Sequence, residues 1–247
     1  MTSDSSVPHH FSDKEEKYIH QFDKYIIPFA DAVEVTLEKL ANPAGYRRLS
    51  KPISEVPELF VPDVLSQAFY MVFVAMKDDA KMGGHLTAAI LCRSLIECMG
   101  NVHWLASSHN GQELKHRSTL LFNQAENIYK YTSGKLDRIP SLSYLGAGSI
   151  ISRIKACGDG WPGIYSHLSS YCHMDAGFAI HYHLQETLGM RNLCVFFACS
   201  AAQQLISDEV ELQSSMPRRF RNDIKKDLVK LEELHQSFLK QRKLSEQ

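Results

Sequence analysis

Apolar residues recur every three or four positions over long stretches of this chain, and this spacing restricts its fold more than any other feature. The first stretch, from Ser12 to Ala41, carries one such stripe: Tyr18, Phe22, Ile26, Phe29, Val33, Leu37 and Leu40. This spacing places the residues on one face of an amphipathic helix. No segment shows the sustained alternation of polar and apolar residues that strands have, so we predict an all-α fold.

Further periodic segments predict seven or eight helices, in a bundle around a buried central helix. The segment from His85 to Ser107 is apolar nearly all round, which is typical of a central helix. Ser12 and Glu15 form a capping box at the first helix, and Pro28 should kink it. The other predicted helices span residues 63–82, 112–132, 149–156, 164–174 and 191–213, and a last one opens at Pro217.

The 247 residues are expected to form one helical domain, residues 1–247, since 44% apolar and 22% charged residues are ordinary for a globular protein. Residues 1–11 are polar and predict a flexible N-terminus. Residues 42–62 hold four of the nine prolines and predict an extended crossover. Residues 217–247 predict a basic, amphipathic C-terminal helix.

Charge and cysteine content predict a cytoplasmic protein without a membrane span or a cofactor. The formal net charge is −1, so no overall field attracts polyanions. The uncharged run from Asn192 to Ser207 is shorter than the roughly 20 apolar residues that a spanning helix needs. The six cysteines include no C-x-x-C pair and are expected to be reduced thiols in the core.

Polar residues interrupt the otherwise apolar segment 85–107. Arg93, Glu97 and Asn101 stand four residues apart and share one helical face, with Trp104 close to the same stripe. Because an unpaired buried charge is costly, Arg93 and Glu97 are expected to be satisfied locally. This stripe predicts the central part of a site.

A second polar segment, Tyr165 to Asp175, reads YSHLSSYCHMD. In a helix, Ser169 and His173 share a face, and Ser170 lies alongside. An imidazole near an Arg–Glu pair can be tuned in pKa. We therefore predict that Arg93, Glu97 and His173 converge as catalytic residues, with binding residues Asn101, Trp104, Tyr165, Ser169 and Ser170.

The motifs R-S-L-I-E (Arg93 to Glu97) and Y-x-x-L-S-x-x-x-H (Tyr165 to His173) resemble a group of uncharacterised bacterial helical proteins placed loosely near the HEPN superfamily. The resemblance covers roughly residues 65 to 205. It implies an all-α, HEPN-like, commonly dimeric protein, and a metal-independent endoribonuclease or nucleotide-acting protein of a bacterial toxin or defence system. Arg93 would then stabilise phosphate charge, His173 would act as general acid or base, and Glu97 would orient one of them.

Two further interpretations of the same residues remain open. In a non-enzymatic helical binding or assembly module, Arg93–Glu97 would be a buried structural pair, whose loss through Arg93→Ala would cost about 3–5 kcal/mol. In a small-molecule sensor, Trp104, Tyr165 and Tyr171 would line a pocket.

Two surface features complete the predicted functions. A basic patch on the last helix, able to bind an acidic partner or RNA, comprises Arg218, Arg219, Arg221, Lys225 and Lys226. A metal site at the histidines of residues 167–183 (His167, His173, His181 and His183, with Cys172 and Asp175) lacks a recognised ligand motif, and no metal is predicted.

Overall fold

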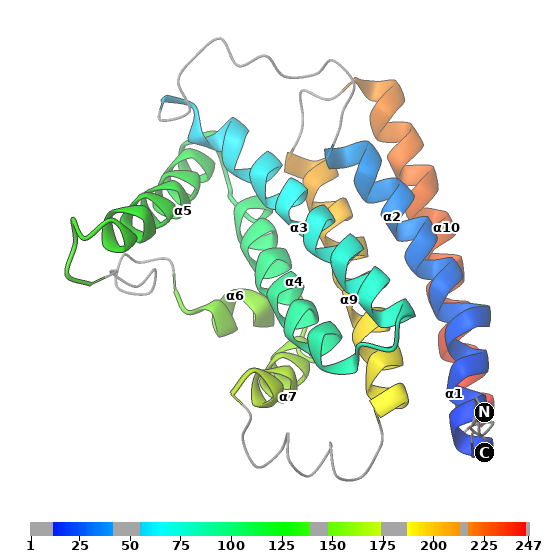
Figure 1. Ribbon diagram of the computed structural model, residues 1–247. Coiled ribbons are helices and arrows are strands. Elements are labelled where there is room, and N and C mark those ends of the chain that lie inside the picture. Colours follow the sequence, from blue (N-terminus) through cyan, green and yellow to red (C-terminus); the bar gives the residue numbers. More distant parts are fainter. Residues whose placement is uncertain (1–11, 42–54, 139–147, 174–186, 213–216, 246–247) are drawn as a thin grey trace, which may run out of the picture.

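A computed structural model describes residues 12–41, 55–138, 148–173, 187–212 and 217–245 (Figure 1). These residues form α-helices and one π-helical segment, and none of them lies in a strand, which confirms the all-α prediction. The elements are α1 (Asp13–Gln21), η1 (Phe22–Ile26), α2 (Ile27–Ala41), α3 (Pro57–Lys81), α4 (His85–Ala106), α5 (Gly111–Thr132), α6 (Ile150–Ala156), α7 (Trp161–His173), α9 (Thr187–Leu212) and α10 (Arg218–Ser245). The predicted flexible N-terminus, 1–11, and most of the crossover, 42–54, lie outside the described residues.

The first three elements, α1, η1 and α2, form one continuous helix. Its predicted capping box is present, because the Ser12 backbone N–H donates to the Glu15 carboxylate at 2.8 Å and the Glu15 N–H donates to the Ser12 hydroxyl at 3.4 Å. Pro28 does not break the helix. Proline has no N–H for the preceding turn, and the ladder is adjusted by the π-helical η1 just before it.

Helix α3 begins at Pro57, so the predicted start at Asp63 and the predicted end of the crossover at residue 62 are wrong. A proline in the first turn costs no hydrogen bond, since the N–H groups there have no partner within the helix. Val61 and Pro62 are buried, and this packing favours helix through Pro62. The helix ends at Lys81, one residue before the predicted end at residue 82, and Gly83 follows with a φ of 93°, which suits glycine.

Helices α4 and α9 form the centre of the bundle (Figure 1). Small, fully buried side chains line them both, which lets the backbones approach closely: Ala88, Ala89 and Cys92 on α4, and Cys194, Ala198, Cys199, Ala201 and Ala202 on α9. The outer helices α3 and α10 run opposite to α2, α4 and α9 (Figure 1). Buried residues from η1 to α10 form one hydrophobic cluster, and α4 is central as predicted.

The six cysteines are all free, and Cys92, Cys194 and Cys199 are buried in the core as predicted, whereas Cys98, Cys157 and Cys172 are only half-buried. Burial raises the pKa of Cys92 well above its ordinary value, and the neighbouring Cys194 adds to this effect. Burial also raises the pKa values of Cys98 and Cys157 to about 12. Thiols with such pKa values hold almost no thiolate at neutral pH and are poor nucleophiles.

Helix α5 projects away from the bundle (Figure 1). Ser118 is the only residue of α5 that is buried. From the sequence, Leu114, Leu121, Ile128 and Tyr131 are the expected inner positions of this helix, but Ile128 and Tyr131 are 46% and 47% exposed, so the expectation is wrong for these two. The amphipathic pattern was present, but the core does not extend beneath the far half of this helix.

Within the described residues, one helix is long and apolar enough to cross a membrane by length and composition, namely α3. A third of its most apolar stretch is buried in the bundle. The rest of that stretch is half-buried or exposed.

Candidate functional site

The polar stripe of α4 meets α7 in a closed network of hydrogen bonds, which we call the α4–α7 clamp (Arg93, Glu97, Tyr165 and Ser169). The Arg93 guanidinium donates from Nη2 to the Tyr165 hydroxyl at 2.7 Å and from Nε to the Ser169 hydroxyl at 3.0 Å. Its Nη2 also lies 2.9 Å from Glu97 Oε1. The Tyr165 hydroxyl in turn donates to Glu97 at 2.7 Å.

The clamp lies at the boundary between core and solvent. The Arg93 and Glu97 side chains are 26% and 34% exposed, whereas Tyr165 is buried. Burial acts to lower the pKa of Arg93, but Glu97 and Tyr165 outweigh it and the pKa is raised. Burial, with the hydrogen bond to Glu97, raises the pKa of Tyr165. Tyr165 therefore keeps its proton and stays a donor to Glu97.

This geometry satisfies the charges within the clamp itself. The guanidinium also lies over the Tyr165 ring, 4.9 Å from its centroid, which adds a cation–π contact. The Ser169 hydroxyl donates back to the Tyr165 carbonyl at 2.8 Å. The Arg93 guanidinium thus faces a carboxylate, a phenol and a hydroxyl, and Glu97 balances its charge within the clamp.

Further along α4, Trp104 contacts α5 and α6 rather than α7. Trp104 lies between two guanidinium groups, with Arg117 at 5.1 Å and Arg153 at 5.4 Å from its ring. The Asn101 Oδ1 atom is buried and accepts no hydrogen bond from the described residues. The predicted stripe therefore divides into two sets of contacts.

His173 is not part of the clamp, and its predicted catalytic role with Arg93 and Glu97 stays a prediction. His173 is the last residue of α7 and is exposed. Ser170 points elsewhere, since its hydroxyl donates to the His167 carbonyl of its own helix at 2.7 Å. Tyr171 is buried and packs edge-on against His167. Of the aromatic residues expected to line a sensor pocket, Tyr165 and Tyr171 are buried and Trp104 is half-buried.

A histidine–carboxylate pair that the sequence did not indicate joins α4 to α9. His103 Nδ1 lies 3.0 Å and 3.2 Å from the two carboxylate oxygens of Asp208, which also accepts from Gln204 at 3.1 Å. The hydrogen bond to Asp208 is the main cause that raises the pKa of His103, and a bond to the Ala156 backbone adds to it. In the sequence, the only indication of this pair was that the charged residue Asp208 lies within the largely apolar segment 191–213.

A buried lysine joins α3 to α2, and this contact was also missed. The Lys77 side chain is 7% exposed and is paired with Asp31 at 2.8 Å and with Glu34. Burial acts to raise the pKa of Asp31, but hydrogen bonds and charge from Lys77 outweigh it and lower the pKa. In the sequence, Lys77 cannot be distinguished from an exposed lysine on a helix. Its burial follows only from the packing of α3 against α2.

No group of three or more His, Cys, Asp or Glu side chains able to hold a metal ion occurs in the described part of the chain. His181, His183 and Asp175, from the histidines of residues 167–183, lie outside it.

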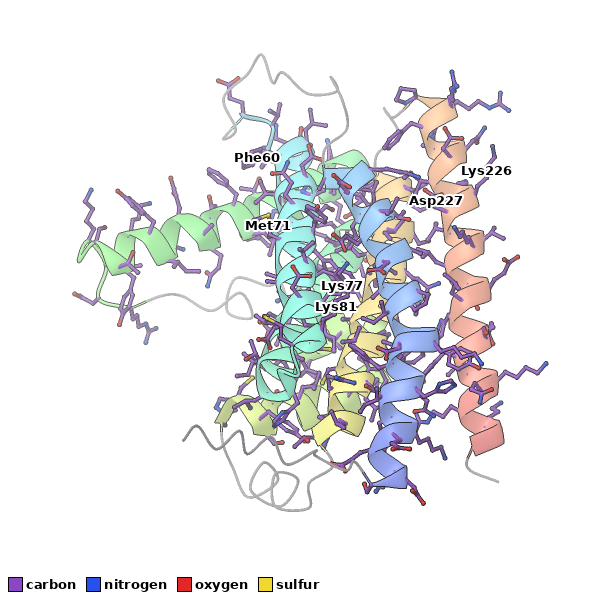
Figure 2. All side chains as sticks on the ribbon, turned by 45° about the vertical axis from the view of Figure 1, so that its right-hand side comes forward. Phe60, Met71, Lys77, Lys81, Lys226 and Asp227 are labelled. Atoms are coloured by element: carbon purple, nitrogen blue, oxygen red, sulfur yellow. The ribbon has the colours of Figure 1, made fainter. Side chains whose placement is uncertain are left out.

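The predicted basic patch lies at the N-terminal end of α10. Arg218, Arg219, Lys225 and Lys226 are exposed, and Arg221 is half-buried. Lys226 lies 3.6 Å from Asp223 in an exposed ion pair. Figure 2 shows Lys226 on the outer side of α10.

Comparisons of this chain with family models, curated proteins and solved structures find no match.

Proposed function

We propose that this protein is a non-enzymatic helical binding module, which takes an acidic protein segment on the basic patch of α10. The clamp of Arg93, Glu97, Tyr165 and Ser169 then serves to hold α7 against α4. The observation that carries the proposal is the charge distribution along α10. Basic side chains gather at its N-terminal end, where the partial positive charge of the helix makes them unfavourable.

A helix N-terminus carries partial positive charge, so acidic residues stabilise it and basic ones destabilise it. Helix α1 follows this rule, with Asp13, Glu15 and Glu16 in its first turn. Helix α10 has no acidic residue in its first turn and begins with Arg218 and Arg219. An arrangement that weakens the free helix is expected where a negative partner binds.

The rest of the chain favours a short acidic segment over RNA. Residues 217–247 hold nine basic and five acidic residues, a net charge of +4, so the remainder carries −5. An RNA strand that extended beyond the patch would meet this negative surface, whereas a short acidic peptide would stay on the patch. The patch also lacks exposed aromatic residues on which bases could stack.

The test is fluorescence anisotropy with a labelled ten-residue glutamate peptide. Charge reversal of Arg219, Lys225 and Lys226 should weaken binding by at least about tenfold, and added salt should weaken it further. The matched control reverses Lys240, Arg242 and Lys243, which are exposed at the other end of α10. Equal effects of the two triple reversals would refute the proposal, and tighter binding of a ten-nucleotide RNA would redirect it to nucleic acid.

The ribonuclease hypothesis stays a prediction. It needs an arginine free to contact phosphate and a histidine nearby, whereas Arg93 is engaged by Glu97 and His173 is exposed. RNA cleavage in the presence of a chelator, compared between the wild type and His173→Ala, tests it directly.

A further inference from the structure

A groove between α2 and α10 lies on the outside of the bundle and has a volume of about 410 Å³. This volume falls within the range of roughly 300–1,000 Å³ that is usual for ligand pockets. The apolar side chains that line it are Pro28, Ala32, Val35, Leu231 and Leu234. Leu231 is 1% exposed and lies at the bottom of the groove, whereas Val35 is 53% exposed and open to solvent at its rim.

Small residues of α2 leave the space for this groove. Ala32 and Thr36 stand four residues apart, so they share one face of α2, and both line the groove opposite Leu231. Figure 1 shows α2 and α10 side by side, and the two helices are in contact. The Thr36 hydroxyl donates to the Ala32 carbonyl at 3.0 Å, so this hydroxyl is already used within α2.

The charged residues that line the groove leave one lysine without a carboxylate partner. Asp227 is paired with Lys39 at 2.6 Å, and Asp31 is paired with Lys77 at 2.8 Å. Lys230 is exposed and forms no ion pair with the residues that the structure describes. The groove thus combines an apolar surface with an uncompensated positive charge, which favours a ligand that carries both apolar and acidic groups.

The groove continues directly from the basic patch along α10. Arg219, Lys226 and Lys230 stand seven and four residues apart, a spacing that places them on one face of the helix. Lys226 belongs to the patch, and the very next residue, Asp227, lines the groove. Figure 2 shows Lys226 on the outer side of α10 and Asp227 on the side toward α2. A partner held by the patch therefore reaches the groove within about one turn of α10.

We infer, building on the proposed function, that the acidic segment bound by the patch belongs to an amphipathic helix whose apolar face lies in this groove. Helices commonly bind to grooves in this way, with anchor side chains at positions i, i+4 and i+7. Such anchors span about 10 Å at 1.5 Å per residue. The apolar lining of α2 extends over the same seven residues, from Pro28 to Val35, so three anchors match the length of the groove.

The test compares the binding of two labelled peptides by fluorescence anisotropy at one salt concentration. Both peptides carry six glutamates followed by a twelve-residue helix of alanine and glutamine, since acidic residues at its start stabilise a helix. One peptide has leucine at positions i, i+4 and i+7 of this helix, and the other has serine there. The leucine peptide should bind the wild-type chain at least about tenfold more tightly than the serine peptide, because only leucine anchors bury apolar surface in the groove.

Two variants of the groove should reduce this ratio of affinities to below about threefold. Val35→Gln removes apolar surface at the rim, and Val35 is 53% exposed, so the variant should fold. Ala32→Phe adds apolar surface but fills the groove, which separates binding in the groove from general stickiness. The matched control is Val229→Gln, since Val229 is 62% exposed on α10 and does not line the groove. It should leave the ratio unchanged, and circular dichroism checks that all three variants are folded.

Equal affinity of the two peptides for the wild-type chain, or a leucine advantage that survives both groove variants, overturns the inference. The proposed function still stands in that case if charge reversal of the patch weakens binding of the glutamate peptide. A leucine advantage that needs Val35 but is indifferent to charge reversal of the patch refutes the proposed function, and with it the acidic partner inferred for the groove. Self-association of the wild-type chain that Val35→Gln abolishes, measured by sedimentation equilibrium without peptide, would assign the groove to a second copy and also overturn the inference.

Discussion

Tyr165 of α7 donates its hydroxyl hydrogen to the Glu97 carboxylate of α4 across 2.7 Å, and the same hydroxyl accepts a hydrogen bond from Arg93. One phenol oxygen thus links both charges of the pair to a second helix. The pair is therefore connected to α7 as well as within α4.

Tyr165→Phe should destabilise the fold by roughly 1–2 kcal/mol, since it removes two hydrogen bonds and leaves the ring in place. Arg93→Ala should cost a similar amount. The 3–5 kcal/mol expected for a fully buried charge is too large, because Glu97 is 34% exposed and water can solvate it. Urea unfolding measures both variants, and a Tyr165→Phe protein as stable as the wild type would contradict the clamp.

The His103–Asp208 pair should make stability depend on pH near neutrality. The pKa of His103 is raised in the folded state, so the contact stabilises fully below the unfolded value of about 6.5 and is lost as pH rises through the folded value. The stability advantage of the wild type over Asp208→Asn should therefore shrink as pH rises above about 6.5. Titration of His103 by nuclear magnetic resonance checks the cause, since its pKa should fall in the variant.

The Lys77–Asp31 contact should make the stability of the fold depend on pH in the acidic range. The pKa of Asp31 is lowered in the folded state, so its contribution is present above the unfolded value of about 3.9 and is lost as pH falls through the folded value. Lys77→Met should keep the stability at pH 7 within about 1–2 kcal/mol, because the methionine fills the space of the buried lysine stem and the Asp31 and Glu34 side chains left behind are 50% and 26% exposed, so water can solvate them. Acid unfolding should then depend less steeply on pH than in the wild type, and an unchanged profile would count against this assignment.

Gly100 of α4 should tolerate no larger side chain. A Cβ atom there would lie 3.0 Å from Ile154 Cγ1, in the fully buried contact between α4 and α6. Gly100→Val should destabilise by at least about 2 kcal/mol through overpacking. Gly111→Val is the control, since nothing lies within 4 Å of its added Cβ and the change should stay within about 0.5 kcal/mol. Equal urea midpoints for the two variants would rule out the close approach.

Local chemistry was enough to predict most elements of the fold. The period of apolar residues identified the helices, and the capping box at Ser12 and the Gly83 turn fixed two of their ends. These signals act within a few residues of the chain, so the sequence contains them in readable form. The start of α3 was mispredicted because its prolines favour an extended chain locally, and burial of Val61 and Pro62 overrides this preference.

The sequence by itself determined that helix 85–107 would carry Arg93 and Glu97 on one face, and that the last helix would be basic at its start. Only the tertiary structure decided which residues meet them. Tyr165 lies 68 residues from Glu97 along the chain, and Asp208 lies 105 residues from His103. The spacing of residues in a helix determines which of its faces is polar, but the packing of whole helices determines what that face contacts. The same packing leaves His173 exposed to solvent and half of α5 outside the core.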